Sequence, residues 1–406
     1  MYKRFLFRLA ILTLPFSIWL GPPLAVIILS GEYEDLDRII QKQADSHRNG
    51  GTDEVLFGPA FTNPMQLYKM LASQSSKADW IALGSSRVMK FRGRFFKEPN
   101  RFYNAGGAIW NVYHLEQWLE QIPVDTQPEL ILLGIDQWNF NANWHPGAEG
   151  LARMKLSPWD NYDQQRPLHT LQTDWQRLWQ EIRLGYLKPR ELLFGSIRLG
   201  GTRVTRIGLQ AMKSNSGFRQ DGSRAYGRFD LRGQLDPQSP DHLFKETLQR
   251  LDTSSSPYDY SDHIEVSHLD PLDRFLEACK KRGIAVITFL PPFAHAVLER
   301  MRSMGEKYPW VLETSKIVEP MVRKHGGSFF DFTDIHSVGS SDKEAIDGHH
   351  GSEKTYLRII HAMAEHDSRL RTVVDLDELR RQLANSFTDC SIYPDVMLTE
   401  TDQQSI

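Results

Sequence analysis

The chain has 406 residues, of which 40% are hydrophobic and 11% aromatic, so it can bury a large core and is not a disordered protein. Its formal net charge of −3 and its scattered arginines argue against nucleic-acid binding. Two cysteines, Cys279 and Cys390, allow one disulfide at most, and Cys279 lies in a helical pattern typical of a buried thiol.

The amino terminus carries the clearest localisation signal. An apolar run from Leu9 to Leu29 contains no charged residue and is long enough to cross a bilayer. Basic residues precede this run and acidic residues follow it. This asymmetry predicts a single pass through the cytoplasmic membrane, with residues 9–29 in lipid, the N-terminus inside and the remaining chain extracytoplasmic, in the periplasm or on the cell surface. A cleaved signal peptide is the alternative, but the run is long for one and no Ala-x-Ala site follows it.

After this anchor (1–31) and a polar linker with a helix (32–74), apolar strands alternate with amphipathic helices. The predicted order is strand 79–83, strand 101–104, helix 112–122, strand 129–135 and, after a break, helix 272–282, strand 284–290, helix 310–324, strand 328–332 and helix 352–365. Strands and helices joined by short connections predict a parallel sheet covered by helices.

The expected fold class is therefore α/β, as a three-layer α/β/α flavodoxin-like domain built from residues 75–145 and 266–368. Residues 146–265 are rich in Arg, Gln, Asp and Gly, and they predict a mostly helical insertion that caps or flanks the sheet. Within it, the polar, Gly-rich segment Ser214–Gly233 predicts a mobile loop. The tail, 369–406, contains one expected helix and a polar end.

Two distant segments combine into a candidate catalytic site. Gly84-Ser85-Ser86 follows the first strand of the predicted sheet, and Asp347-Gly348-His349-His350 precedes the last helix of that domain. A serine becomes a nucleophile when a base takes its proton, and an Asp and a His three residues apart can supply and orient such a base. Taken alone, the serines more commonly cap a helix, and the second segment is as readily a surface loop or half of a metal site. The histidines at 325, 336 and 361 are scattered, so no metal is expected.

Two further segments follow predicted strands. They are Asn104-Ala105-Gly106 and Gly134-Ile135-Asp136. Ligands of open parallel sheets bind at the carboxyl ends of the strands, so both segments are candidates for substrate contact. Each one taken alone is more simply an ordinary turn.

Together these segments resemble the SGNH (GDSL-like) hydrolase superfamily. That family has a serine turn after the first strand, a glycine after the second, a Gly-x-Asn-Asp block after the third and Asp-x-x-His near the end. The likeness covers about 75–145 and 270–365. Within the superfamily, the chain is most similar to membrane-anchored members linked to acylation of cell-envelope polysaccharides, such as D-alanyl-transfer and alginate-acetylation proteins.

The resemblance implies a serine esterase or O-acyltransferase acting on acyl groups, acetyl foremost, of a cell-surface or secreted polysaccharide. It implies no cofactor, and a multi-pass membrane acyltransferase is the implied partner. Ser86 would be the nucleophile, His350 the base and Asp347 the residue that orients the base. The backbone N–H groups of Ser86 and Gly106 would stabilise the oxyanion.

Two departures from the family pattern leave alternatives open. Ser85 replaces the usual Asp, so either serine could attack. Asp136 replaces the usual Asn, and a carboxylate donates no hydrogen bond unless it is protonated, so Asp136 is either a protonated oxyanion donor or a structural residue. The Asp136 substitution also supports a second hypothesis, a catalytically inactive scaffold or assembly protein of a polysaccharide machinery.

Three residues near the strand ends are expected to bind substrate: Arg87, Trp110 and Trp138. The two tryptophans would stack on sugar rings, and core packing is the alternative for both.

Overall fold

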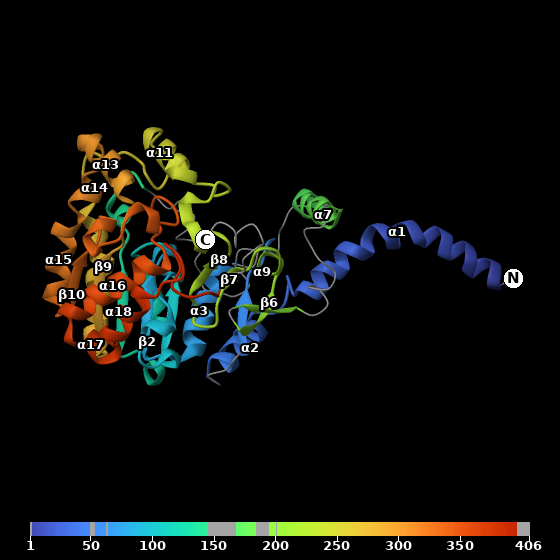
Figure 1. Cartoon of the computed structure of the whole chain (residues 1–406), viewed down its shortest axis with the longest axis horizontal. Coiled ribbons are helices and arrows are strands. Elements are labelled where there is room, and N and C mark those ends of the chain that lie inside the picture. The colour runs from blue at the N-terminus through green and yellow to red at the C-terminus, as the bar shows by residue number, and fades with distance from the viewer. Residues whose placement is uncertain are drawn as a thin grey trace.

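The computed structural model describes residues 2–48, 53–61, 64–144, 168–183, 195–199 and 201–395 (Figure 1). Its central element is a five-stranded, all-parallel sheet in the order β3-β2-β4-β9-β10. The strands are β2 (Trp80–Gly84), β3 (Phe102–Gly106), β4 (Leu130–Gly134), β9 (Ala285–Leu290) and β10 (Ser328–Asp331). The α/β class with a parallel sheet is confirmed, because the continuous apolar runs do form strands buried on both faces.

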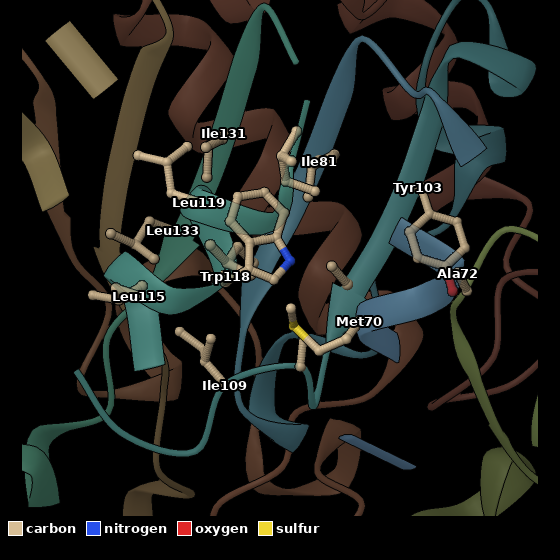
Figure 2. Packing of buried hydrophobic residues seen from close by; sticks show 14 of the residues in the cluster. Met70, Ala72, Ile81, Tyr103, Ile109, Leu115, Trp118, Leu119, Ile131 and Leu133 are labelled. Carbon is tan, nitrogen blue, oxygen red and sulfur yellow. The ribbon is translucent and has the colours of Figure 1, made fainter. Parts of the chain in front are cut away.

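Alternate side chains of these strands enter two cores, one on each face of the sheet. One core is completed by α3 (Met65–Ser76), α4 (His114–Gln121), α12 (Leu269–Lys281) and α15 (Thr314–Lys324), and the other by α16 (Glu353–His366), α17 (Ser368–Val373) and α18 (Leu376–Ala384). Figure 2 shows the first core, where Trp118 of α4 lies over the strand residues Ile81 and Ile131, and its indole N–H donates to Ser73 Oγ at 3.2 Å.

A second, mixed sheet stands where a mostly helical insertion was expected. Its strand order is β5-β6-β1-β7-β8. The strands are β1 (Asp53–Phe57), β5 (Ser196–Leu199), β6 (Thr202–Ile207), β7 (Ser216–Phe218) and β8 (Arg224–Tyr226). β1 comes from the predicted linker and pairs in parallel with β6. These strands are short, so the alternation of apolar and polar residues along each one is too brief to predict a strand. They form only when they pair with strands far away in the sequence.

The prediction that Ser214–Gly233 is a mobile loop is wrong, since this segment contains β7 and β8. Its side chains include Phe218, 2% exposed, and Ser223, fully buried. Its glycines allow close backbone packing and do not mark mobility: a Cβ on Gly222 would lie 2.2 Å from the Asn104 carbonyl oxygen.

Two segments expected to be peripheral also belong to the folded body. The tail packs Leu370, Leu379 and Ile392 into the second core. At the start of the predicted linker, Glu32 is 2% exposed, and its carboxylate accepts the backbone N–H groups of Ala60, Phe61 and Leu209, each at 2.7 Å. The polar character of this segment therefore reflects buried hydrogen bonding.

Helix α1 (Tyr2–Ser30) extends away from the folded body, and α7 (Leu168–Arg183) lies beside its inner end (Figure 1). The segment Ile11–Ser30 of α1 is long and apolar enough to cross a membrane, judged by length and composition. The last turns depart from expectation, because Pro23, Val26 and Ser30 are buried against the body.

Candidate active site

The serine turn lies where the strand order reverses. β3 and β4 flank β2, so the chain moves first to one side of β2 and then to the other. In open parallel sheets this reversal leaves a crevice at the carboxyl ends of the strands. Gly84-Ser85-Ser86 is at that crevice, because it follows β2 directly.

The two serines of the turn have different partners. Ser85 caps the short 3₁₀ helix Ser86–Val88, and its Oγ accepts the Arg87 N–H at 3.1 Å. Ser86 Oγ lies 2.9 Å from His350 Nε2, so it is the serine beside a base. The helical segments within residues 86–101 are short 3₁₀ turns, which give little helix dipole.

The histidine loop completes the arrangement. His350 Nδ1 lies 2.7 Å from Asp347 Oδ2, and Asp347 Oδ1 accepts the backbone N–H groups of His349 and His350, both at 2.9 Å. Burial by itself would raise the pKa of Asp347, but the two neighbouring imidazoles and these hydrogen bonds outweigh it and hold that pKa well below its ordinary value. The carboxylate therefore stays ionised and fixes the orientation of His350.

Ser86 of the serine turn and His350 and Asp347 of the histidine loop thus form one continuous chain of hydrogen bonds. A serine bonded to one imidazole nitrogen, with a carboxylate on the other, can lose its proton while it attacks a carbonyl carbon. Ser86 and His350 are both partly exposed, so a substrate can reach them.

One of the two expected oxyanion donors is free. Among the described residues, no acceptor is bonded to the Ser86 backbone N–H. The Gly106 N–H, by contrast, donates to Asn104 Oδ1 at 2.8 Å. Asn104 is held in place by its own amide group, which donates to the carbonyls of Val88 and Phe91, both at 2.9 Å. In this arrangement the Gly106 N–H is therefore occupied, and its expected role as an oxyanion donor stays a prediction.

The glycines at three strand ends instead make room for one side chain. A Cβ on Gly84, Gly106 or Gly134 would lie 2.8, 2.8 or 2.3 Å from the Val88 side chain. Val88 is fully buried and belongs to the same 3₁₀ turn as Ser86. The three glycines therefore leave space for Val88, and through it the serine turn packs against the carboxyl ends of the strands.

Replacing Gly134 with alanine is expected to lower the free energy of unfolding by about 1–3 kcal/mol, since the added methyl group overpacks against Val88. Displacement of Val88 should also shift Ser86 and reduce its reactivity. Thermal melts and turnover would be compared with Gly134→Ala/Val88→Ala, which removes the clash. If the second substitution restores neither quantity, Val88 does not link the glycine to the serine turn.

Arg87 was expected to bind substrate, but it is 1% exposed. Its guanidinium donates to the His349 carbonyl at 3.0 Å, to Gln137 Oε1 at 2.7 Å and to the Pro291 carbonyl at 2.7 Å. These contacts direct the side chain into the protein and do not support the expected contact with substrate. Arg87 joins the serine turn to the histidine loop and is a positioning residue.

Asp136 is equally buried, with Oδ1 3.5 Å from Arg87 Nη1. Burial raises the pKa of Asp136, and the Arg87 charge and a hydrogen bond with Ser85 offset part of that rise. Burial also lowers the pKa of Arg87, and Asp136 offsets that effect in turn. Of the two roles left open for Asp136, the contacts favour the structural one, as the counter-charge of a buried arginine.

The two tryptophans differ in position. Trp138 is 6% exposed, with its ring 4.8 Å from the Arg87 guanidinium and 5.8 Å from the His349 ring. Trp138 belongs to a buried cluster, which favours the core-packing alternative over stacking on sugar. Trp110 is 46% exposed on the loop after β3, so it remains available for a ligand.

Residues that sequence reasoning did not select hold the histidine loop in place. Tyr258 OH lies 2.8 Å from His349 Nδ1, and burial lowers the pKa of His349 to about 3, so this imidazole is neutral. The Asp241 carboxylate accepts the Gly348 N–H at 2.9 Å and the Thr247 hydroxyl at 2.7 Å. All three supporting residues come from the 146–265 segment, and no local pattern there signals their proximity to the loop.

A pocket of about 470 Å³ opens beside the same loop, which is a size suited to a small-molecule ligand. Tyr226, in its wall, has its ring 6.3 Å from that of His350. Aromatic and charged side chains share the lining, among them Asp347, His349, Tyr226, Phe229, Arg228, Glu246 and Arg250.

His336, expected to be isolated, lies in a second cluster. Its ring stacks on that of His295 at 3.9 Å, and His295 Nδ1 lies 3.0 Å from Asp334 Oδ2. One ring nitrogen of each histidine and one carboxylate oxygen of Asp334 lie within 4.8 Å of one another, which is close enough for a shared cation. Arg302 Nη1, 3.5 Å from Asp334, already supplies a positive charge there.

Comparison with known proteins adds no assignment. No protein-family model, no curated protein and no solved structure matches this chain. The interpretation of the site therefore rests on its own geometry.

Proposed function

We propose that this protein is a serine esterase or O-acyltransferase of the SGNH type, anchored in the cytoplasmic membrane by α1 with its catalytic domain outside. The observation that carries the proposal is the hydrogen-bonded chain Ser86–His350–Asp347, with distances of 2.9 and 2.7 Å. The strand order β3-β2-β4-β9-β10 supports it, because this is the flavodoxin-like order 2-1-3-4-5 with the serine at its switch point.

In the proposed reaction, Ser86 Oγ attacks an ester carbonyl while His350 Nε2 takes the hydroxyl proton. The Ser86 backbone N–H stabilises the resulting oxyanion. The intermediate collapses, the ester C–O bond breaks, and His350 returns the proton to the leaving alcohol. A second hydroxyl, from water or from an acceptor, then gives its proton to His350 and attacks the acyl carbon. The bond from this carbon to Ser86 Oγ breaks, and His350 returns the proton to Ser86 Oγ.

The proposed substrate is an acyl group, acetyl foremost, on a cell-surface or secreted polysaccharide. Exposed Trp110 and the polar, aromatic pocket beside Asp347 support it, because rings and charged groups together suit a polyhydroxy ligand. A multi-pass membrane acyltransferase is the proposed source of the acyl group.

One observation favours a second candidate function, the inactive scaffold. The Gly106 N–H is occupied and Asp136 faces a buried arginine, so the second oxyanion donor of the family pattern is missing among the described residues. A single donor weakens stabilisation of the oxyanion, and one such donor is worth roughly a hundredfold in rate.

Labelling the full-length protein in detergent with a fluorophosphonate distinguishes the two candidates. We expect covalent labelling that is lost in His350→Ala, because Ser86 then has no base. His349→Ala is the matched control and should still be labelled, since its imidazole bonds Tyr258 and not the serine. Absence of labelling in the folded parent protein at every pH would favour the scaffold.

A further inference from the structure

The cluster of His295, Asp334 and His336 lies outside the candidate active site. His295 is the first residue of α13 (His295–Ser303), and the other two lie at the start of the 3₁₀ turn Ile335–Val338. These segments follow β9 and β10, so the cluster is at the carboxyl edge of the central sheet. Imidazole nitrogens and carboxylate oxygens are ligands of zinc in proteins.

The distances within the cluster are close to those of a tetrahedral zinc site. Zinc bonds to nitrogen and oxygen are about 2.0–2.2 Å long, so two tetrahedral ligand atoms lie about 3.4 Å apart. His295 Nδ1 lies 3.1 Å from Asp334 Oδ1 and 3.0 Å from Asp334 Oδ2. A zinc ion can therefore replace the proton between these groups with a small change in their separation. The exposed His336 ring makes no hydrogen bond within the described residues, so it can turn toward the ion.

The backbone that carries the cluster is held by its own hydrogen bonds. The Phe293 N–H donates to the Thr333 carbonyl at 2.9 Å, and the Ile335 N–H donates to the Phe293 carbonyl at 3.2 Å. Phe293 and Ile335 are both buried. Asp334 Oδ1 also accepts the His336 N–H at 3.0 Å. An ion bound here orders little more than side chains, and this preorganisation favours its binding.

Arg302 repels a cation at the cluster but does not exclude one. Its Nη1 lies 3.5 Å from Asp334 Oδ2 and 2.5 Å from Glu299 Oε1, and its side chain is 45% exposed. Exposed ion pairs are weak, so the guanidinium can leave Asp334 and keep its contact with Glu299. Arg302 therefore lowers the affinity of the cluster for a cation.

The histidine loop offers a second set of ligand types. Asp347, His349 and His350 also place one ligand atom each within 4.8 Å of the others. His350 Nε2, however, lies beside Ser86 Oγ, and His350 Nδ1 lies beside Asp347 Oδ2. His349 Nδ1 lies beside the Tyr258 hydroxyl. These contacts use both nitrogens of His350 and one of His349, so the loop is the less suitable place for an ion.

We propose that His295, Asp334 and His336 bind a divalent transition-metal ion, zinc foremost, with water as the fourth ligand. Three protein ligands leave that fourth position open. The ion joins the start of α13 to the segment after β10. It also supports the histidine loop, because the Ala294 N–H donates to the Gly348 carbonyl at 3.0 Å. The proposal is independent of the proposed function, since no step of acyl transfer uses the ion.

The test uses full-length protein without a histidine tag, in detergent, after treatment with a chelator. Bound zinc is measured by equilibrium dialysis. We expect the parent to bind one zinc ion that His336→Ala does not bind, and zinc should raise the melting temperature of the parent only. The two proteins should melt alike without zinc, since His336 is exposed. Absence of this difference in bound zinc would overturn the proposal.

His350→Ala and His325→Ala are the matched controls. His325 Nε2 lies 2.6 Å from Asp273 Oδ1, and within the described residues this pair has no third ligand group. Both variants should bind zinc as the parent does. Loss of zinc in His350→Ala with retention in His336→Ala would place the ion at the histidine loop and refute the proposed site.

Two further variants test whether Asp334 is a ligand. Asp334→Asn keeps a cap for the 3₁₀ turn but removes the charge, and it should weaken zinc binding by about tenfold or more. Arg302→Gln should strengthen binding by about fivefold, because it removes a positive charge about 4 Å from the ion. If Asp334→Asn binds zinc no more weakly and Arg302→Gln binds it no more tightly, Asp334 is not a ligand and the proposed site is wrong.

Discussion

Replacing Ser86 with alanine should reduce turnover of a chromogenic acetyl ester by about a thousandfold or more, because the reaction then has no nucleophile. The fold should be kept, since the hydrogen bond to His350 Nε2 is the only one that Ser86 Oγ makes within the described residues. The measurement is steady-state hydrolysis by full-length protein in detergent, with the melting temperature recorded alongside.

Ser85→Ala is the matched control for this prediction. It removes the cap on the 3₁₀ turn and the hydrogen bond with Asp136, so stability should fall by about 1 kcal/mol while most of the turnover remains. If Ser85→Ala is inactive and Ser86→Ala retains turnover, the proposed nucleophile is wrong. Full activity in both variants would show that neither serine of this turn is the nucleophile.

The Arg87→Met variant should lower the free energy of unfolding by about 3–5 kcal/mol, because it leaves the carboxylate of Asp136 buried without its counter-charge. It also removes three hydrogen bonds, including the one to the histidine loop. Arg274→Met is the control, since Arg274 forms an exposed pair with Glu116 and should cost at most about 1 kcal/mol. Thermal or urea unfolding in detergent measures both variants.

This loss of stability should depend on pH. Without Arg87, burial raises the pKa of Asp136 still further above its unfolded value of about 3.9. The folded variant then favours the protonated carboxyl, so the part of its penalty that comes from the unpaired charge is absent below about pH 4 and grows as pH rises through the raised pKa. The part that comes from the three lost hydrogen bonds remains at every pH. Arg87→Met/Asp136→Leu should recover part of the lost stability at neutral pH. A penalty that is the same at acid and neutral pH would exclude the charge pair as its cause.

The central sheet was predictable because its strands are buried on both faces and give continuous apolar runs, as Leu130–Gly134 does. The serine and histidine segments were predictable for another reason, since a turn or loop of a few residues carries its own chemistry. Their common location at one sheet edge follows from the parallel order of the strands.

The second sheet was not predictable, because β1 pairs with β6 across a sequence separation that no local pattern reveals. The contacts of Gly106 and Arg87 were not predictable for a related reason. A glycine or an arginine beside a catalytic serine has the same sequence signal whether it faces a substrate or the interior. The three-dimensional contacts distinguish these two cases. For Gly106 the contact is the Val88 side chain, and for Arg87 the contacts are the acceptors around the guanidinium.

Hydrogen bonds of Glu32 and Ser30 join the end of α1 directly to the folded body. The Glu32 carboxylate holds three backbone N–H groups, and the Ser30 carbonyl accepts the Gly208 N–H at 2.7 Å. Under the proposed function, this joint leaves no flexible linker between the membrane and the folded body. The crevice would then stay at a fixed distance from the lipid, and a polysaccharide substrate would have to reach it at that distance.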